Sequence, residues 1–268
     1  MSIVGVFDSG IGGLTVAREV SAAFPEVDLY YLGDTARLPY GVKSPATVVR
    51  YALRCVEFLV GTGADVIVVA CNTATACALP DLQAAWPHKM IVGVIEPGAR
   101  AAVAASRSAV IGVIGTEATI SSASYTRAIH ALNPSATVHG LACPLLVPLA
   151  EVGWLDHDVT RLTIRTYLKP LFASAPDIDT LVLGCTHYPA LKPAIAAVLA
   201  DMKLGHRVAL VDSAEAVTAD LRERLAGVTG GGLRELHVTD LPARFASVAA
   251  TFWRGPLPPV SHVDITAA

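Results

Sequence analysis

The sequence predicts an α/β fold with two similar three-layer α/β domains, each built on a mostly parallel sheet, and a cleft between them. Short apolar runs alternate with helical patterns along most of the chain. This alternation is typical of parallel sheets that carry helices on both faces. Three pairs of segments recur in the same order, which indicates an internal duplication. Two of the apolar runs end in a cysteine followed by polar side chains, as expected where such sheets bind ligands.

The apolar runs predict eight strands, because they are short, rich in β-branched residues and bounded by turn-forming residues. They are Ile3–Phe7, Asp28–Leu32, Val66–Ala70, Met90–Ile95, Val110–Ile114, Thr137–Leu141, Thr180–Gly184 and Val208–Val211. Helical patterns fill the segments between them. One helix is predicted to begin after Ser44, an N-cap residue followed by Pro45, and to end at Gly61 or Gly63.

The three recurring pairs of segments have nearly constant offsets of 107, 109 and 114 positions. They are VGVFDS from Val4 with IGVIGT from Ile111, Tyr31–Gly33 with Gly140–Ala142, and Ala64–Thr73 with Ile178–His187. A duplicated pair of domains explains this order better than a single larger sheet, which is the alternative. We therefore expect a first domain at residues 1–97 plus about 210–256, a second at 98–209, and a loose Pro-rich tail at 257–268.

Composition excludes several classes of protein. The chain has 268 residues, of which 53% are hydrophobic and 16% charged, so a sizeable core is expected. The net charge is −3 without a basic cluster, which argues against nucleic acid or an acidic membrane surface as a partner. No apolar run approaches the roughly 20 residues of a membrane span, and no secretory signal is expected. Five widely spaced cysteines indicate free thiols in a reducing cytoplasm.

Cys71 and Cys185 each follow a predicted strand and precede hydrogen-bonding side chains, which distinguishes them from the other cysteines. Free cysteine is usually a buried packing residue, and this interpretation suffices for Cys55, Cys77 and Cys143. Because their strands are similar and belong to two similar domains, the strand ends bring the thiols of Cys71 and Cys185 to one cleft. The sequence therefore predicts a single site with a cysteine on each side.

Three kinds of site use such thiols. A zinc site with His187 lacks the usual ligand spacing, because no second Cys or His lies two to four residues from Cys71. A single nucleophilic cysteine with a histidine base leaves the other cysteine unexplained. Proton transfer at carbon from opposite faces uses both, with one thiolate removing a proton and the opposing thiol returning one. Asp8 is then placed to tune Cys71, and His187, oriented by Glu151, to tune Cys185.

Four motifs together resemble glutamate racemases, in an order that extends from Ile3 to about Ser213. They are DSGIGGLTV from Asp8, GDTARLPYG from Gly33, ACNTAT from Ala70 and LGCTHYP from Leu183. The resemblance implies two α/β domains related by pseudo-twofold symmetry with the active site between them. It also implies a cofactor-independent enzyme that converts L-glutamate to D-glutamate for bacterial peptidoglycan synthesis. We further expect a homodimer in the cytoplasm.

By this resemblance, Cys71 acts on the D-enantiomer and Cys185 on the L-enantiomer. Asp8 matches the acid beside the first cysteine, His187 the histidine beside the second, and Glu151 the acid that supports this histidine. Substrate contacts are implied for Asp8, Ser9, Tyr40, Gly41, Asn72, Thr73, Thr116, Thr119, Thr186 and His187. One departure is Ala214, at a position where related sequences often have glycine, and it lies outside these residues.

The sequence fits other ligands and functions less well. The DSGIGG turn is not a phosphate loop, because it lacks the G-x-G-x-x-G spacing and a Walker lysine. No lysine has a context typical of pyridoxal-phosphate attachment, so that cofactor is not expected. No metal is expected either, because the usual spacing of ligands is missing. The rival functions are an aspartate or hydantoin racemase, which would recognise another side chain, and a non-catalytic amino-acid-binding protein. Both cysteines in matched positions argue against the last.

Overall fold

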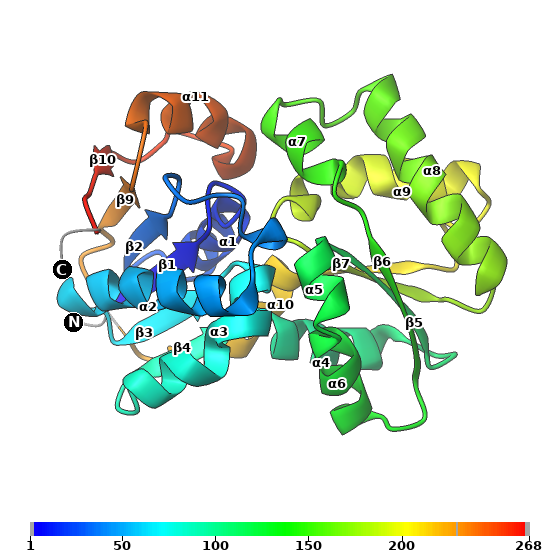
Figure 1. The fold of residues 1–268 in the computed structure, drawn as a ribbon, viewed down its shortest axis with the longest axis horizontal. Coiled ribbons are helices and arrows are strands. Elements are labelled where there is room, and N and C mark those ends of the chain that lie inside the picture. Colours follow the sequence, from blue (N-terminus) through cyan, green and yellow to red (C-terminus); the bar gives the residue numbers. More distant parts are fainter. Residues whose placement is uncertain (1–2, 229, 266–268) are drawn as a thin grey trace.

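The computed structural model describes residues 3–228 and 230–265, which form two parallel sheets side by side (Figure 1). The first sheet has the order β10-β9-β2-β1-β3-β4 and the second β6-β5-β7-β8. The strands of the first are β1 (Ile3–Asp8), β2 (Asp28–Gly33), β3 (Val66–Val69), β4 (Met90–Gly93), β9 (Arg234–Val238) and β10 (Val260–His262). Those of the second are β5 (Val110–Gly115), β6 (Thr137–Ala142), β7 (Thr180–Gly184) and β8 (Ala209–Asp212).

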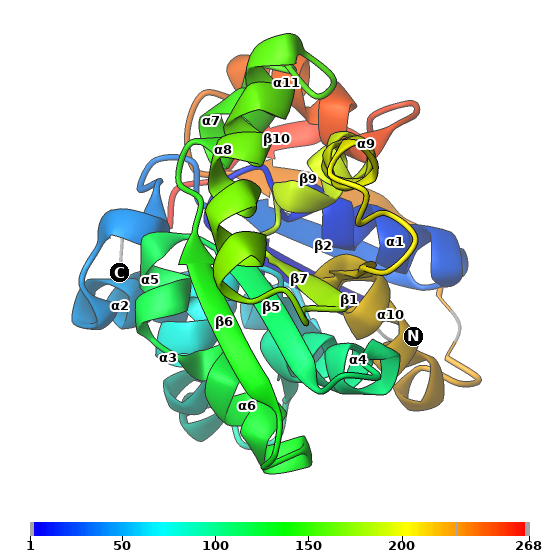
Figure 2. The ribbon, with the colours of Figure 1, turned by 90° about the vertical axis from the view of Figure 1, so that its right-hand side faces the viewer.

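Helices cover both faces of each sheet, so each half has three layers. The helices are α1 (Leu14–Ala23), α2 (Pro45–Gly61), α3 (Asn72–Ala85), α4 (Ile95–Ala105), α5 (Glu117–Ser121), α6 (Ser124–Leu132), α7 (Leu146–Glu151), α8 (Asp158–Ser174), α9 (Lys192–Asp201), α10 (Ser213–Arg224) and α11 (Pro242–Trp253). The short 3-10 turns are η1 (Tyr40–Val42) and η2 (Tyr188–Leu191). Figure 2 shows α8 in front of β5 and β6 of the second sheet. No helix of the described residues is long and apolar enough to cross a membrane.

The two sheets repeat one topology, which confirms the predicted fold class. The order β2-β1-β3-β4 in the first sheet corresponds to β6-β5-β7-β8 in the second, and every described strand pair is parallel. The recurring sequence segments fall on β1 and β5, on β2 and β6, and on β3 and β7. The alternative of a single larger sheet is therefore wrong.

All eight predicted strands form, with ends shifted by at most two residues, but two strands were not predicted. The segment of β9 begins with Arg234 and Glu235, whose charges hide the strand pattern. β10 lies in the expected loose tail, where Val260 pairs with Leu236 at the edge of the first sheet. The expectation of a loose tail is wrong for this segment, because a chain that follows prolines can still pair as an edge strand. The outermost residues of the expected first domain and tail, 1–2 and 266–268, lie outside the described residues.

The chain passes from the first sheet to the second after β4 and returns after β8. α4 begins at Ile95, and this residue packs with Ile111 and Val182 in the apolar cluster of the second sheet. β8 pairs with β7 up to Asp212, so the return to the first sheet comes after that residue rather than at 209. The exact division at 97 and about 210 stays a prediction.

The predicted helix after Ser44 is α2, and its start shows how the local sequence acts. Ser44 is in an extended conformation, its hydroxyl accepts from the Thr47 N–H at 3.4 Å, and Pro45 occupies the first helical position. The helix ends at Gly61, as predicted. Its buried face joins α3 in covering the first sheet, and α3 starts directly after Cys71. The packing of these helices fixes the end of β3, where the candidate site begins.

Candidate active site

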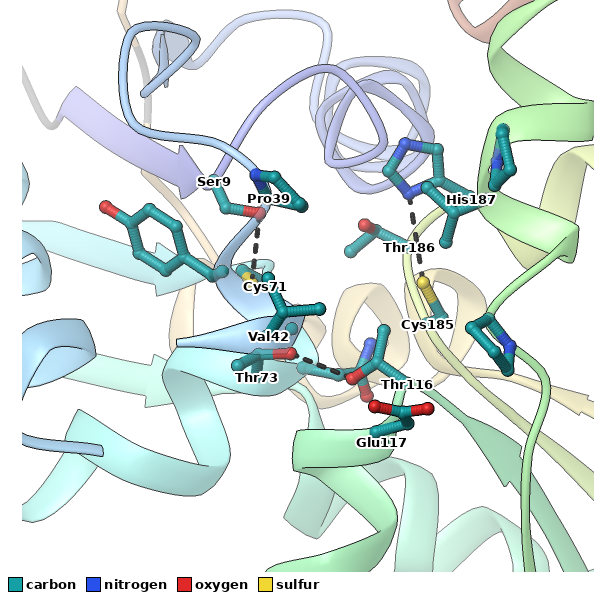
Figure 3. A pocket seen from close by; sticks show the side chains of 16 residues that line it. Ser9, Pro39, Val42, Cys71, Thr73, Thr116, Glu117, Cys185, Thr186 and His187 are labelled. Atoms are coloured by element: carbon teal, nitrogen blue, oxygen red, sulfur yellow. Dashed lines mark hydrogen bonds between the residues drawn. The ribbon is translucent and has the colours of Figure 1, made fainter. Parts of the chain in front are cut away.

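A cavity of about 240 Å³ lies between the carboxyl ends of the two sheets. Both Cys71 and Cys185 line it, as the sequence predicts. Figure 3 shows Ser9, Cys71 and Thr73 on one side, with Cys185 and His187 on the other. The cavity is lined by Ser9, Pro39, Tyr40, Gly41, Val42, Cys71, Asn72, Thr73, Thr116, Glu117, Pro144, Val147, Pro148, Cys185, Thr186 and His187.

Cys71 is held at the start of a helix. It follows β3 by two residues and caps α3, where its Sγ accepts from the Ala74 N–H at 3.4 Å. Its thiol donates to the Ser9 hydroxyl oxygen, also at 3.4 Å (Figure 3). Burial, followed by the negative charge of Asp8, raises the pKa of Cys71 to about 12. The resting Cys71 therefore carries its proton at neutral pH.

Cys185 has a different neighbour. It follows β7 directly, and its Sγ lies 3.8 Å from Nδ1 of His187, whose Nε2 lies 3.0 Å from a Glu151 carboxylate oxygen. Burial lowers the pKa of His187, but the hydrogen bonds and charges of Cys185 and Glu151 outweigh it and raise this pKa to about 10. A protonated imidazole therefore lies beside the Cys185 sulfur at neutral pH. Phe252 of α11 meets the His187 ring edge-on, with centroids 5.6 Å apart.

Glu151 forms the outer end of this chain of contacts. Burial alone would raise its pKa, but the hydrogen bond and the positive charge of His187 hold this pKa below the ordinary value of a glutamate. Glu151 does not line the cavity, although the neighbouring Val147 and Pro148 of α7 do. Glu151 contacts His187 as its predicted orienting role requires, and the role itself stays a prediction.

Asp8 is fully buried behind the cavity rather than on its wall. Its carboxylate accepts from the Gly10 N–H at 3.0 Å and from the Thr186 hydroxyl at 3.3 Å. Burial raises the pKa of Asp8, and the positive charge of His187 opposes this shift. The sequence predicts that Asp8 lies beside Cys71. The structure adds that Asp8 accepts a hydrogen bond from Thr186, the residue after Cys185. The Asp8 carboxylate thus lies close to the segments of both cysteines.

Three threonines join the two halves below the cavity. The hydroxyl oxygen of Thr116 lies 3.0 Å from that of Thr73 and 3.0 Å from that of Thr119. Thr116 also caps α5, since its hydroxyl accepts from the Thr119 N–H at 3.3 Å. Thr73 and Thr116 line the cavity, whereas Thr119 is buried behind them and does not. The predicted substrate contact of Thr119 therefore stays a prediction, since this side chain does not reach the cavity wall.

Tyr40 and Gly41 line the cavity, but the Tyr40 hydroxyl is directed elsewhere. It donates to the buried carboxylate of Asp34, which also contacts Arg37 at 2.8 Å. The first N–H groups of a helical turn have no partner within it. The backbone N–H groups at the start of η1, rather than the Tyr40 phenol, are thus the donors of this turn without a partner within it.

Asn72 lines the cavity with an amide that is only partly satisfied. Its Oδ1 accepts from the Tyr125 hydroxyl at 2.8 Å. Among the described residues its Nδ2 has no hydrogen-bond partner, although the side chain is buried. A buried donor without a partner is costly, which indicates that a ligand group completes it.

Several contributors were not predicted from the sequence. Pro39, Val42, Glu117, Pro144, Val147 and Pro148 line the cavity, and Asp34, Tyr125 and Phe252 hold lining residues in place. Pro39 lies within the GDTARLPYG motif, and Glu117 directly follows the predicted Thr116. Tyr125 and Phe252 lie on ordinary amphipathic helices and give no local signal. The described residues contain no group of three or more His, Cys, Asp or Glu that could hold a metal ion.

Comparisons with known proteins identify the family of this chain. The family described as Asp/Glu/Hydantoin racemase matches residues 14–221. The chain belongs to this racemase family. A glutamate racemase of Geobacter metallireducens is 49% identical over 270 residues, which cover 98% of this chain and 97% of that protein. The predicted resemblance and the expectation of an amino-acid racemase, an isomerase, are thereby confirmed.

Solved structures of racemases share the fold. A glutamate racemase from Bacillus anthracis is 39% identical, with a TM-score of 0.89 over 98% of this chain and 97% of that one. A glutamate racemase from Francisella tularensis in complex with D-glutamate is 33% identical, with a TM-score of 0.90 over 100% and 99% of the two chains. Both halves of this racemase and the cavity between them thus lie within the matched regions.

The pair of Glu151 and His187 should stabilise the racemase in a pH-dependent way. The pKa of His187 in the folded protein is raised, so its contribution is fully present below pH 6.5 and is lost as pH rises through about 10. Glu151→Gln should lower the free energy of unfolding by about 1 kcal/mol at pH 6, since Glu151 is partly exposed and solvent screens its charge. The difference should shrink toward pH 10 in urea unfolding measured across this range.

The matched control is Glu57→Gln, which removes a carboxylate from an exposed ion pair with Arg54. Its effect should be small at every pH. A loss in Glu151→Gln that stays constant from pH 6 to pH 10 would show that His187 is not the group stabilised by Glu151.

Proposed function

We propose that this protein interconverts L- and D-glutamate without a cofactor, by a two-base mechanism in which Cys71 and Cys185 are the acid and base. The observation that carries the proposal is that both thiols line one cavity from opposite sheets. A planar carbanion between two such groups can lose a proton on one face and gain one on the other. Neither a metal nor a packing role accounts for this opposition.

The surroundings of the two thiols favour one starting arrangement. Cys71 keeps its proton because burial and Asp8 raise its pKa, whereas Cys185 lies beside a protonated His187. In the direction from L to D, the Cys185 thiolate removes the α-proton of L-glutamate and the Cys71 thiol delivers its proton to the opposite face. This leaves a Cys185 thiol and a Cys71 thiolate, and proton exchange with solvent restores the first state.

The polar lining supports an amino acid with two carboxylates as the substrate. The Nδ2 of Asn72 is an unsatisfied buried donor, and the hydroxyls of Ser9, Thr73, Thr116 and Thr186 lie on or beside the same walls. Backbone N–H groups at the start of α3 add further donors at a helix N-terminus. Relatives at 44–49% identity are glutamate racemases, and one solved structure holds D-glutamate. Glutamate is therefore the substrate that these features favour.

The carbanion must form without an electron-withdrawing cofactor. Positioning of the α-hydrogen against a sulfur, desolvation of the thiolate and fixed dipoles around the substrate carboxylate would supply the stabilisation. Cys71 and Cys185 are each 5% exposed, so a substrate held between them is largely shielded from water. We further propose that the D-glutamate supplies bacterial peptidoglycan synthesis in the cytoplasm, and that the enzyme acts as a homodimer.

The two-base mechanism makes a direct prediction in heavy water. With L- or D-glutamate and no added cofactor, the product should carry deuterium at the α-carbon. Cys71→Ala and Cys185→Ala should each lower racemization by at least about 100-fold, since each removes one acid–base group. Optical rotation and proton NMR measure inversion and exchange. Cys77→Ala is the control, because this cysteine lies on α3 outside the cavity.

The outcomes separate mechanism from substrate. Full racemization by either Cys71→Ala or Cys185→Ala would rule out two opposed thiols. Turnover of aspartate in parallel assays, with none of glutamate, would keep the mechanism and overturn the proposed substrate. Deuterium exchange and inversion of glutamate by the wild-type protein, together with the losses predicted for the two cysteine variants, would support both the mechanism and the substrate.

Variants of two clustered threonines test which of them contacts the substrate directly. Thr116→Val removes a hydroxyl that lines the cavity, whereas Thr119→Val removes one that lies behind it. Both changes keep the side-chain shape and disturb the same cluster. We expect Thr116→Val to raise the KM for glutamate about tenfold and Thr119→Val to raise it by less than about threefold. Equal KM values for the two variants would contradict a direct contact by Thr116.

A further inference from the structure

Tyr125 of α6 contacts the chain beside both cysteines. Its hydroxyl donates to Oδ1 of Asn72, the residue after Cys71, at 2.8 Å. Its ring lies against Gly184, the residue before Cys185, since a Cβ built on Gly184 would lie 3.1 Å from Cε2 of Tyr125. The contact with Asn72 joins α6 of the second half to α3 of the first half. The contact with Gly184 stays within the second half.

The ring of Tyr125 is fixed on two sides. A Cβ built on Gly98 of α4 would lie 3.2 Å from the ring and from its hydroxyl oxygen, so both Gly98 and Gly184 leave just enough room for it. Tyr125 itself is 3% exposed. α6 and α4 pack together in the same apolar cluster, which includes Tyr125, Ala99 and Ile129. The hydroxyl therefore has a defined position relative to the second sheet.

The direction of the hydrogen bond fixes the amide of Asn72. Burial raises the pKa of Tyr125, so its hydroxyl keeps its proton and needs an acceptor. With Oδ1 as that acceptor, Nδ2 of Asn72 is directed away from Tyr125, and this nitrogen is the atom left without a partner. The reversed amide would present an oxygen to a substrate carboxylate, and two acceptors repel each other.

We propose that Tyr125 is a positioning residue that turns the Asn72 amide so that its N–H groups meet a carboxylate of the substrate. This inference rests on the proposed function, because it takes glutamate as the ligand. It assigns Tyr125 no contact with the substrate and no part in proton transfer. It also means that a binding group of the first half is oriented from the second half, so the binding site is complete only when the halves are together.

The test uses a variant that keeps the ring. Tyr125→Phe removes only the hydroxyl, and we expect the KM for both glutamate enantiomers to rise about tenfold, while kcat falls by less than about threefold. This split follows because the carboxylate contact is made equally in the ground state and the transition state. Ligand binding is measured separately as the rise of the thermal midpoint with added D-glutamate, which should shrink in the variant.

A double-mutant cycle distinguishes orientation from general damage. If Tyr125 acts through Asn72, then Tyr125→Phe in the Asn72→Ala background should change KM by less than about twofold. Tyr31→Phe is the matched control: Tyr31 is fully buried, and its hydroxyl donates to the Gly10 carbonyl at 2.9 Å rather than to Asn72. Its effect should combine additively with Asn72→Ala.

Each result has one meaning. Wild-type KM values in Tyr125→Phe, or the same rise in both the wild-type and Asn72→Ala backgrounds, would overturn the orienting role. In either case racemization of glutamate by the wild-type protein would leave the proposed function intact. Absence of glutamate racemization in the wild type would instead overturn the proposed function. A KM rise that Tyr125→Phe causes in the wild-type background, where Asn72 is present, but not in the Asn72→Ala background would support the inference.

Discussion

The parallel pairing of the central strands determines where chemistry can occur in this molecule. β1 pairs with β3 in the first sheet and β5 with β7 in the second, so the carboxyl ends of each pair reach one edge. Cys71 and Cys185 lie just past those edges, and the cavity exists because the edges face each other. A shift of one residue in either pairing would turn each strand's side chains to the opposite face and separate the thiols. The helices serve to keep this alignment.

Symmetry of the scaffold does not extend to its electrostatics. On one side, burial and the Asp8 carboxylate hold the proton on Cys71. On the other, the imidazole of His187 lies 3.8 Å from Cys185 and keeps its own proton through Glu151. Asp8 is hydrogen-bonded to Thr186 and so belongs to both environments. One buried carboxylate thereby favours a thiol at Cys71 and a positive charge near Cys185, which is the difference that opposed acid–base groups require.

The sequence predicts the parts of the fold that are encoded locally. Eight strands follow from apolar runs, the start of α2 follows from Ser44 and Pro45, and both cysteines follow from their places after two such runs. The pattern of β9 is hidden because the strand begins with the charged residues Arg234 and Glu235, and β10 gives no signal because it is a short edge strand that follows prolines. Tyr125 was missed for another reason: its contacts with Asn72 and Gly184 depend on tertiary packing, which leaves no spacing in the sequence.

The same hydrogen bonds that close the cavity also define what it binds. Thr73 meets Thr116, Tyr125 meets Asn72 and Thr186 meets Asp8, and each bond joins one half of the chain to the other. Bonds of this kind each contribute about 1 kcal/mol net, so separating the halves at the cavity costs little. The apolar cluster that runs through α1 and α10 joins the halves behind it. Both thiols are almost fully covered, so a substrate that reaches them lies among these bonds. Asn72, Thr73 and Thr116 both line the cavity and form these bonds, so the contacts that join the halves also hold in place the side chains that face a ligand.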